Sequence, residues 1–401
     1  MRGYEESHPW ITFDAREIND LDARIWMELG EARSKCEHIA GAPLQPAVAK
    51  RLYEVTLIKG AQATVAIEGN TMTTEQVEGI YRGEYKAPTS RSYQEREVQN
   101  VLDALTEIDN QVIGGIAPAI TPELIRKYNR TILEGTEFDD HVEPGQIRKY
   151  SVGVTGYRGA PWEDCETLVE RLADWLESDT FKSDDPDVQF ALAIISAVLA
   201  HLYIAWIHPF GDGNGRTARL LEFLILARCG MVPLPAAHLL SNHYNLTRDR
   251  YYLELSKASR TKMISGFVRY AVAGITDGLR EQIESVQGQQ FRVTWINYVH
   301  ETMNRFPSNA TRDRQRSLVL AMPSGTWLDR DDLPGLTPKL AAAYGKTGPR
   351  TLARDLNRPL GEGLVRKGQK GTWISNDQII RAFLPPVAST TEGEATSDGV
   401  V

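Results

Sequence analysis

The stretch that decides the fold is residues 188–219, VQFALAIISAVLAHLYIAWI followed by HPFGDGNGRTAR. Its first part is almost entirely apolar and is about as long as a helix that crosses a bilayer. However, Gln189 and His201 interrupt the apolar surface, and acidic residues rather than a basic cluster directly precede it. We therefore interpret it as a central helix buried on all sides by other helices. Such a helix delivers the glycine-rich loop that follows to a fixed position.

Helical spacing of apolar residues extends outward from this segment over most of the first 280 residues. The stretch from Tyr150 to Arg158 (YSVGVTGYR) alternates instead and contains β-branched residues and glycines, which predicts a short hairpin. The fold class is therefore mainly α. The expected helices cover about 18–37, 46–67, 92–110, 122–131, 164–176, 186–206, 216–228, 249–257 and 264–290.

The composition excludes several classes of protein. With 42% hydrophobic and 24% charged residues, the 401-residue chain is not wholly disordered, collagen-like or held together by disulfides. A net charge of −8 is unlike that of a chain that coats nucleic acid or anionic lipid along its whole length. Three scattered cysteines fit a reducing compartment, and the polar N-terminus lacks the apolar stretch of a secretory signal. We expect a cytoplasmic protein that does not span a membrane.

We expect four regions along the chain: a helical N-terminal region (1–110), a catalytic core (111–280), a small α+β domain (285–385) and a disordered tail (386–401). The small domain is basic, and a helix carrying Arg350, Arg354 and Arg358 precedes two short strands around a basic tip. This pattern resembles a winged helix. DNA binding by the module is the less favoured alternative to a docking or structural role.

The loop that follows residue 207 has the features of a polyphosphate site. Gly211, Gly213 and Gly215 allow backbone N–H groups to approach an anion closely. The next helix begins near Arg216 and directs the positive end of its dipole toward the same place. Arg216 and Arg219 lie on one face of its first turn, where two cations are unfavourable unless several negative charges bind.

Two further side chains complete this site. A carboxylate at Asp212 would repel a phosphate unless a magnesium ion lay between them, and magnesium held by one carboxylate plus phosphates is the usual arrangement. His208 is the group in the loop that titrates near neutral pH, so it can accept a proton. The residues themselves thus indicate a magnesium–nucleotide site with a general base.

HPFGDGNGRTAR resembles the signature of the Fic (filamentation induced by cyclic AMP) family, HxFx(D/E)GNGRxxR, at every fixed position. The resemblance implies a protein adenylyltransferase, which moves AMP from ATP to a Tyr, Thr or Ser hydroxyl of a target protein or of itself. It implies that His208 is the general base and that Asp212 holds Mg²⁺. It also implies that Gly213, Asn214 and Gly215 bind phosphate oxygens and that Arg216 and Arg219 hold the β- and γ-phosphates.

A second motif, Thr64 to Asn70 (TVAIEGN), ends a helix with Glu68 in its last turn, where the dipole favours a base. A pair between Glu68 and Arg219 would relieve both unfavourable positions. TVAIEGN is similar to the family's inhibitory motif (S/T)xxxE(G/N), in which the glutamate pairs with the second arginine and prevents productive ATP binding. The resemblance therefore implies an autoinhibited enzyme. An exposed glutamate before a glycine cap is the alternative, and a role of Glu68 in removing AMP stays open.

The hairpin resembles the family's flap, which pairs with an extended segment of the target. Val154, Thr155, Gly156 and Tyr157 are then expected to dock the target through its backbone, and a purely structural hairpin is the alternative. Tyr252, in the segment RYYL, resembles a position near the nucleotide base, although core packing explains it equally well.

Other functions remain as alternatives. The same fold can transfer UMP from UTP, because the signature binds phosphates and does not identify the base. Doc-like phosphotransfer is disfavoured, since those relatives depart from the GNGR part of the signature. A DNA-binding regulator with a Fic sensor core is a different class, and the intact His208, Asp212 and Asn214 argue against it. A homodimer is expected only by analogy with relatives.

Overall fold

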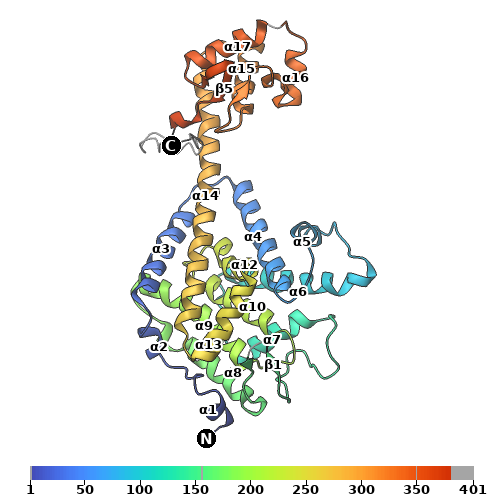
Figure 1. The fold of residues 1–401 in the computed structure, drawn as a ribbon, viewed down its shortest axis with the longest axis vertical. Helices are drawn as coiled ribbons and strands as arrows, with labels where there is room; N and C mark the ends of the chain where they lie inside the picture. Colours follow the sequence, from blue (N-terminus) through green and yellow to red (C-terminus); the bar gives the residue numbers. More distant parts are fainter. Residues whose placement is uncertain (1, 155–156, 349, 381–401) are drawn as a thin grey trace, which may run out of the picture. The chain divides into compact units, whose positions relative to one another are not determined.

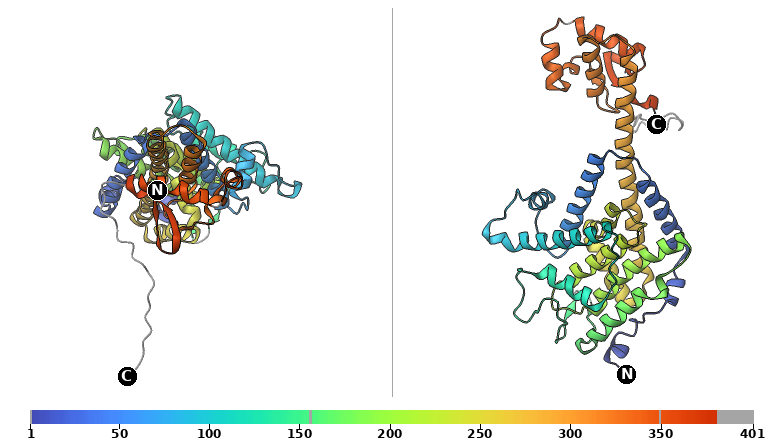
Figure 2. Two further views of the ribbon diagram at one scale, coloured as in Figure 1. Left: turned by 90° about the horizontal axis from the view of Figure 1, so that it is seen from above. Right: turned by 180° about the vertical axis from the view of Figure 1, so that it is seen from behind.

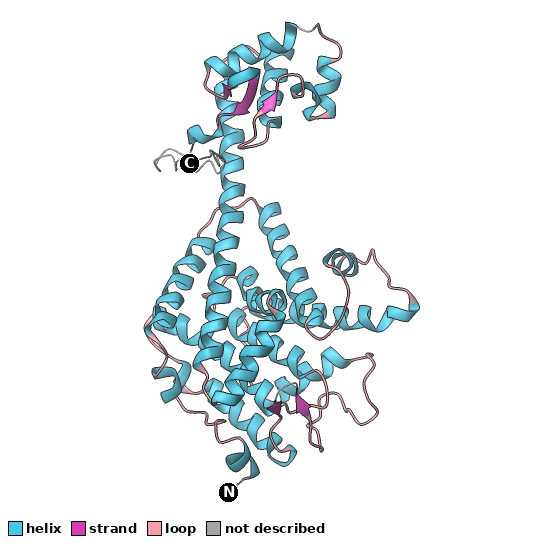
Figure 3. Cartoon of the chain, in the orientation of Figure 1, coloured by secondary structure: helices cyan, strands magenta, loops and turns pink. Residues whose placement is uncertain are grey.

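The computed structural model describes residues 2–154, 157–348 and 350–380. The chain divides into two compact units, Met1–Val286 and Gln287–Val401. Helices dominate the described residues, and the strands are short (Figure 3), so the mainly helical class is confirmed. The tail expected at 386–401 lies outside the described residues.

The first unit is a stack of helices with one small hairpin (Figure 1). Its helices are α1 (Gly3–Ser7), α2 (Arg16–Asn19), α3 (Ala23–Ala40), α4 (Pro46–Ala66), α5 (Thr74–Tyr81), α6 (Ser92–Ile113), α7 (Pro122–Leu133), α8 (Trp162–Glu177), α9 (Pro186–Ile207), α10 (Asn214–Arg228), α11 (Leu234–Ala237), α12 (Leu239–Leu246) and α13 (Arg248–Thr261). The strands β1 (Gly153–Val154) and β2 (Tyr157–Arg158) pair antiparallel, at the place where the hairpin was predicted.

Helix α14 (Ser265–Asn304) continues from the first unit into the second. The sequence predicts a helix over 264–290, but the helix continues to Asn304, so the predicted end is wrong. Gly288 is the helix-weakening residue nearest to that point, and a Cβ added there would meet nothing within 4 Å. A glycine costs a helix about 1 kcal/mol, which is too little to end it without a capping arrangement.

Helix α9 is the centre of the first unit. The Asp185 side chain accepts hydrogen bonds from the N–H groups of Asp187 and Val188, and Pro186 occupies the first turn, so the helix start is well defined. The most apolar window of α9 is fully buried, although its length and hydropathy would also suit a membrane span. The interpretation of a central helix enclosed by other helices is therefore confirmed.

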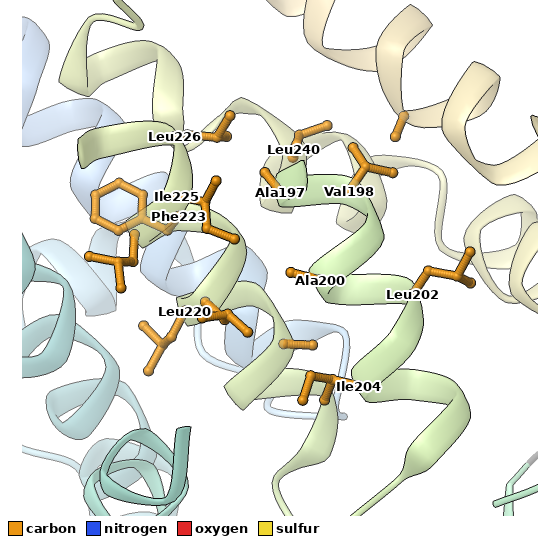
Figure 4. Close-up of a cluster of buried hydrophobic side chains, with 14 of the residues drawn as sticks. Ala197, Val198, Ala200, Leu202, Ile204, Leu220, Phe223, Ile225, Leu226 and Leu240 are labelled. Carbon is orange, nitrogen blue, oxygen red and sulfur yellow. The ribbon is translucent and has the colours of Figure 1, made fainter. Parts of the chain in front are cut away.

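Helix α10 packs along α9 (Figure 4). Ala197 and Ala200 on α9 are fully buried and small, so the two backbones can approach closely, while Leu220 and Phe223 on α10 fill the adjacent space. This pairing fixes the loop between the two helices, because both of its ends continue into buried helices that pack against each other.

Helix α4 packs against α6 and α12, and the opposite views in Figures 1 and 2 both show it beside them. The approach to α12 is very close at Gly60, where an added Cβ would stand within 3.0 Å of the His238 ring. Because α4 is held in this way, the segment after it, which contains Glu68, has a defined position.

The second unit has its own hydrophobic core. It contains α15 (Ala310–Ala321), α16 (Pro338–Tyr344), α17 (Arg350–Gly361), β3 (Leu328–Asp329), β4 (Val365–Lys367) and β5 (Thr372–Ser375). The strands form an antiparallel sheet in the order β3-β5-β4. Arg314 pairs with the buried Asp355, which also accepts a hydrogen bond from the Tyr344 hydroxyl, so polar contacts as well as apolar ones hold α15, α16 and α17 together.

Candidate functional site

The loop between α9 and α10 reverses the chain by means of two left-handed residues. His208 ends α9 with φ 50° and ψ 57°, and Gly213 precedes α10 with φ 76°. The Asn214 side chain closes the loop, since it accepts a hydrogen bond from the Phe210 N–H and donates one to the Phe210 carbonyl, both over 2.9 Å. Its amide is thus used within the loop. The first N–H groups of α10, which have no partner inside a helix, remain available for an anion.

His208 has the protonation state that a general base needs. Burial lowers the pKa of its imidazole to about 4, and the positive charge of Arg148 acts in the same direction. Glu68 and Asp212 raise this pKa by smaller amounts. The imidazole is therefore neutral at pH 7, with a lone pair that can accept a proton.

The two arginines of α10 are buried and face carboxylates. Arg216 is 4% exposed and lies 3.2 Å from Glu97 Oε1 on α6 and 3.5 Å from Asp212 Oδ1. Arg219 is 1% exposed and donates from Nη2 to the Thr64 carbonyl over 2.9 Å and to Glu68 Oε1 over 2.5 Å. The structure thus brings Glu68 and Arg219 together as the sequence predicts.

This pair is charged but leaves donors unused. Burial alone would raise the pKa of Glu68, but Arg219 outweighs that effect, so the pKa lies below its ordinary value. Burial likewise opposes the charge on Arg219, and Glu68 more than compensates, raising its pKa. Nε and Nη1 of Arg219 and Nε of Arg216 are buried and have no hydrogen-bond partner among the described residues. Unpaired buried donors cost free energy, so an anion with several oxygens would suit this place better than one carboxylate does.

Glu68 lies against the start of α10. A Cβ added to Gly215 would stand less than 3.0 Å from Glu68 Oε1 and 3.2 Å from Arg219 Nη1. The absence of a side chain at Gly215 therefore gives an acidic group direct access to the positive end of the helix. In this structure the acidic group is the Glu68 carboxylate.

Asp212, in the loop just before α10, is a further carboxylate close to these arginines, since its Oδ1 lies 3.5 Å from Arg216. It is 44% exposed and accepts a hydrogen bond from the Gly213 N–H. Within the described ranges no group of three or more His, Cys, Asp or Glu side chains could hold a metal ion by itself. A single carboxylate fits magnesium that is shared with phosphate oxygens, which needs few protein ligands.

Two supporting residues were not predicted. Asn129 on α7 is fully buried, donates to the Asp212 carbonyl over 2.8 Å and to Thr217 Oγ1 over 3.3 Å, and accepts from the Gly145 N–H over 2.9 Å. Arg148 is also buried and donates from Nε to the His208 carbonyl over 2.7 Å. Both act over long distances in sequence. The position of Arg148 just before the predicted hairpin is a feature of the sequence that could have drawn attention to it. No comparable feature marks Asn129, which lies within a predicted helix.

The remaining expected site residues lie on two other segments. Val154 and Tyr157 pair with each other through their backbones in the hairpin, while Thr155 and Gly156 lie outside the described residues. The Tyr252 hydroxyl donates to the Ile67 carbonyl over 3.1 Å, and its side chain is partly exposed. Tyr252 thus lies beside the segment that contains Glu68.

The loop between α9 and α10 lies in a region of the chain that matches a known protein family. Residues 119–226 match the model of the Fic/DOC family. The chain is 29% identical over 256 residues to the protein adenylyltransferase fic-1 of Caenorhabditis elegans, covering 63% of this chain and 46% of that protein. It is 30% identical over 217 residues to the protein adenylyltransferase Fic of Nematostella vectensis, covering 54% and 48%. The chain spans about half the length of the curated relatives it matches.

Solved structures give the same picture of the fold. Fic-1 of C. elegans superimposes with a TM-score of 0.54 at 26% identity, covering 66% of this chain and 74% of that one. A Fic family protein of Desulfovibrio desulfuricans has a TM-score of 0.52 and covers 87% of this chain and 95% of its own. At 20% identity, the second likeness bears on the fold alone.

Proposed function

We propose that this chain, whose residues 119–226 form a Fic/DOC domain, is a protein adenylyltransferase that Glu68 holds inactive. The observation that carries the proposal is the pair between Glu68 and Arg219 at the start of α10. The Glu68 carboxylate lies at the start of α10 against Arg219. Even so, Nε and Nη1 of Arg219 and Nε of Arg216 are buried without a partner among the described residues. A nucleotide triphosphate supplies the oxygens that these nitrogens lack.

In the proposed reaction, neutral His208 accepts the proton of the target hydroxyl while the hydroxyl oxygen attacks the α-phosphorus of ATP. The bond from that phosphorus to the bridging oxygen breaks, and pyrophosphate leaves in line with the incoming oxygen. Arg216 and Arg219 hold the departing phosphates, and the N–H groups at the start of α10 add to the positive field. Magnesium bound at Asp212 would supply further neutralisation of the developing charge.

Glu68 restrains this reaction by occupying a phosphate position. The carboxylate engages Arg219 and lies over Gly215, so a γ-phosphate cannot use the same nitrogen at the same time. ATP then binds in a less favourable pose or more weakly. The pair also compensates the charge of Arg219 in the absence of nucleotide, although two of its nitrogens stay without a partner among the described residues.

The test compares wild type with Glu68→Gly, incubated with magnesium and ATP labelled at either the α- or the γ-phosphorus. We expect Glu68→Gly to incorporate α-label into itself or into lysate proteins at least tenfold faster than wild type, and no γ-label. His208→Ala in the same background is the negative control. Incorporation of γ-label would show phosphotransfer and overturn the proposal, and equal rates for both proteins would remove the inhibitory role of Glu68.

The same assay separates the closest alternatives. With UTP, CTP and GTP offered at equal concentration, mass spectrometry of the modified peptides identifies the transferred nucleotide, and an increment of UMP would replace ATP as the substrate. Adding purified wild type to already labelled protein tests removal of AMP. Faster loss of label with wild type than with Glu68→Gly would assign that second activity to Glu68.

The second unit supports a weaker proposal. Arg350 and Arg354 on α17 are exposed, and β4 and β5 follow them as a hairpin, as in a winged helix. Arg358, however, lies over the ring of Phe306 and within reach of Gln315. We favour a docking or structural role over DNA binding. A salt-dependent shift of mixed-sequence duplex DNA by the full chain, lost in an Arg350→Ala/Arg354→Ala variant, would reverse this preference.

A further inference from the structure

The C-terminal end of α9 is buried, and its last carbonyl groups need partners from outside the helix. Ala160 N–H donates to the Trp206 carbonyl over 3.3 Å. The Arg148 side chain donates to the next two carbonyl groups. Its Nη2 donates to the Ile207 carbonyl over 3.4 Å, and its Nε donates to the His208 carbonyl over 2.7 Å. Its own backbone N–H donates to the Pro209 carbonyl over 3.0 Å. The chain around Arg148 and Ala160 therefore caps the helix that carries the general base.

The same guanidinium also binds both sides of the hairpin base. Nη1 donates to the Tyr150 carbonyl, which lies before β1, and Nη2 donates to the Ala160 carbonyl, which lies after β2. Arg148 is 4% exposed, and its side-chain hydrogen bonds in the described part of the chain all go to carbonyl oxygens. A guanidinium has five N–H donors in one plane and can serve all four of these carbonyl oxygens. An ammonium has three donors and a primary amide has two, so neither can replace it fully.

Close packing at Gly159 strengthens this link. A Cβ added to Gly159 would stand 3.0 Å from the His208 Cβ and 3.1 Å from Arg148 Nη2. The backbone that follows β2 thus lies directly against both the base and the guanidinium. A displacement of the hairpin base would move His208, and the reverse also holds.

We propose that Arg148 is a positioning residue that joins the hairpin and the general base into one unit. It fixes the left-handed backbone at His208 and, through Tyr150 and Ala160, the place where the hairpin presents a target segment. The inference rests on the proposed transfer reaction. It predicts a defect in chemistry without a defect in nucleotide binding, because Arg216 and Arg219 hold the phosphates, whereas the side-chain hydrogen bonds of Arg148 in the described part of the chain go to backbone carbonyls.

The first experiment places Arg148→Gln and Arg148→Lys in the Glu68→Gly protein. We expect self-labelling from α-labelled ATP at saturating ATP to fall about 100-fold in Arg148→Gln, as for a misplaced reacting group, and less in Arg148→Lys. The dissociation constant for magnesium ATP, measured by calorimetry, should change less than about twofold. Arg228→Gln is the control, since Arg228 is another arginine that donates to a carbonyl, that of Pro118, although it also pairs with Glu177. It should leave both quantities within about twofold.

Chemical rescue and a crystal structure complete the test. Guanidinium at low millimolar concentration should restore part of the activity of Arg148→Ala, whereas urea at the same concentration should not. In a crystal of Arg148→Gln, His208 should leave its left-handed backbone conformation or the chain at Tyr150 and Ala160 should separate. An unchanged loop and hairpin base would overturn the inference, as would a transfer rate within threefold of the parent or a parallel loss of ATP binding.

The outcomes also separate this inference from the proposed function. If Glu68→Gly with Arg148 intact incorporates no label, the proposed function fails, and the crystal structure alone decides the positioning role. If Glu68→Gly is active and Arg148→Gln is equally active, only the positioning role fails.

Discussion

The hydroxyl of Tyr252 donates a hydrogen bond to the carbonyl of Ile67, the residue directly before Glu68. On the other side, Arg219 donates to the carbonyl of Thr64 as well as to the Glu68 carboxylate. The segment that contains Glu68, for which we propose an inhibitory role, is therefore held by Arg219 and by Tyr252. Loss of either contact should make Glu68 easier to displace.

Tyr252→Phe should raise basal self-labelling of the otherwise wild-type protein by about two- to fivefold, because one partly exposed hydrogen bond is worth about 1 kcal/mol or less. The aromatic ring stays in place, so packing against a nucleotide base is retained. In the Glu68→Gly background the same change should have no effect. A drop in activity there would show instead that the hydroxyl contributes to nucleotide binding.

Gly215→Ala should impair the site in either background, since the new methyl group would occupy the space now taken by the Glu68 carboxylate. With Glu68 present, we expect the free energy of unfolding, measured with urea, to fall by about 1–3 kcal/mol. In Glu68→Gly, ATP affinity and transfer should fall at least tenfold. Gly30→Ala on α3 is the control, because a Cβ there meets nothing within 4 Å. It should be neutral or stabilise by about 0.5–1 kcal/mol.

Acid should destabilise the protein through its buried histidines. Burial lowers the pKa of His208 to about 4 and that of His238 to about 3, from an ordinary 6.5. The unfolded chain therefore binds protons first as the pH falls, so this stability is complete above pH 6.5 and decreases below it. We expect a loss of roughly 2 kcal/mol for each of the two at pH 5.

The measurement is the free energy of unfolding between pH 7.5 and 5 for wild type, His238→Gln and His38→Gln. His38 is exposed on α3, so its replacement should leave the slope unchanged, whereas His238→Gln should reduce it. Transfer by Glu68→Gly should also be nearly independent of pH between 6 and 8. A midpoint near 6.5 in that profile would contradict the low pKa of His208.

Asn129→Asp should weaken the loop between α9 and α10 although the two side chains have the same shape. A carboxylate oxygen would replace the amide that donates to Asp212 and Thr217, and it would face the Asp212 carbonyl with like charge. We expect a loss of about 2–4 kcal/mol in the free energy of unfolding and a lower affinity for ATP. Asn110→Asp, at an exposed position on α6, should change neither by a measurable amount.

The parts of the structure that were predicted have local causes. Helix α9 follows from an apolar run without a basic flank, and the start of α10 follows from the glycines and arginines of its first turn. The pair between Glu68 and Arg219 was predicted because each charge is at the unfavourable end of its own helix, so that a pair would relieve both positions. The resemblance of TVAIEGN to the family's inhibitory motif favoured this pair over an exposed glutamate, which the charges alone did not do.

The parts that were missed depend on contacts between distant segments. Asn129 and Arg148 serve carbonyls of the loop near residue 208, and their local sequence has no feature that reveals those acceptors. The side chain of Asn214 is likewise used to close the loop, which the motif alone does not disclose. The continuous helix α14 was missed because the sequence predicts a domain boundary near residues 280–285, and one helix extends across the boundary between the two units.

The full burial of α9 has a consequence for how the chain must be synthesised. Helix α10 emerges from the ribosome after α9. Before α10 is synthesised, the apolar surface of α9 lacks the helix that covers most of it in the folded protein. A fragment that stops at Ile207 would expose a segment with the hydropathy of a membrane span, which invites aggregation or recognition by insertion machinery. The loop between α9 and α10 thus lies at the point in the chain beyond which translation must continue before α9 can be covered by α10.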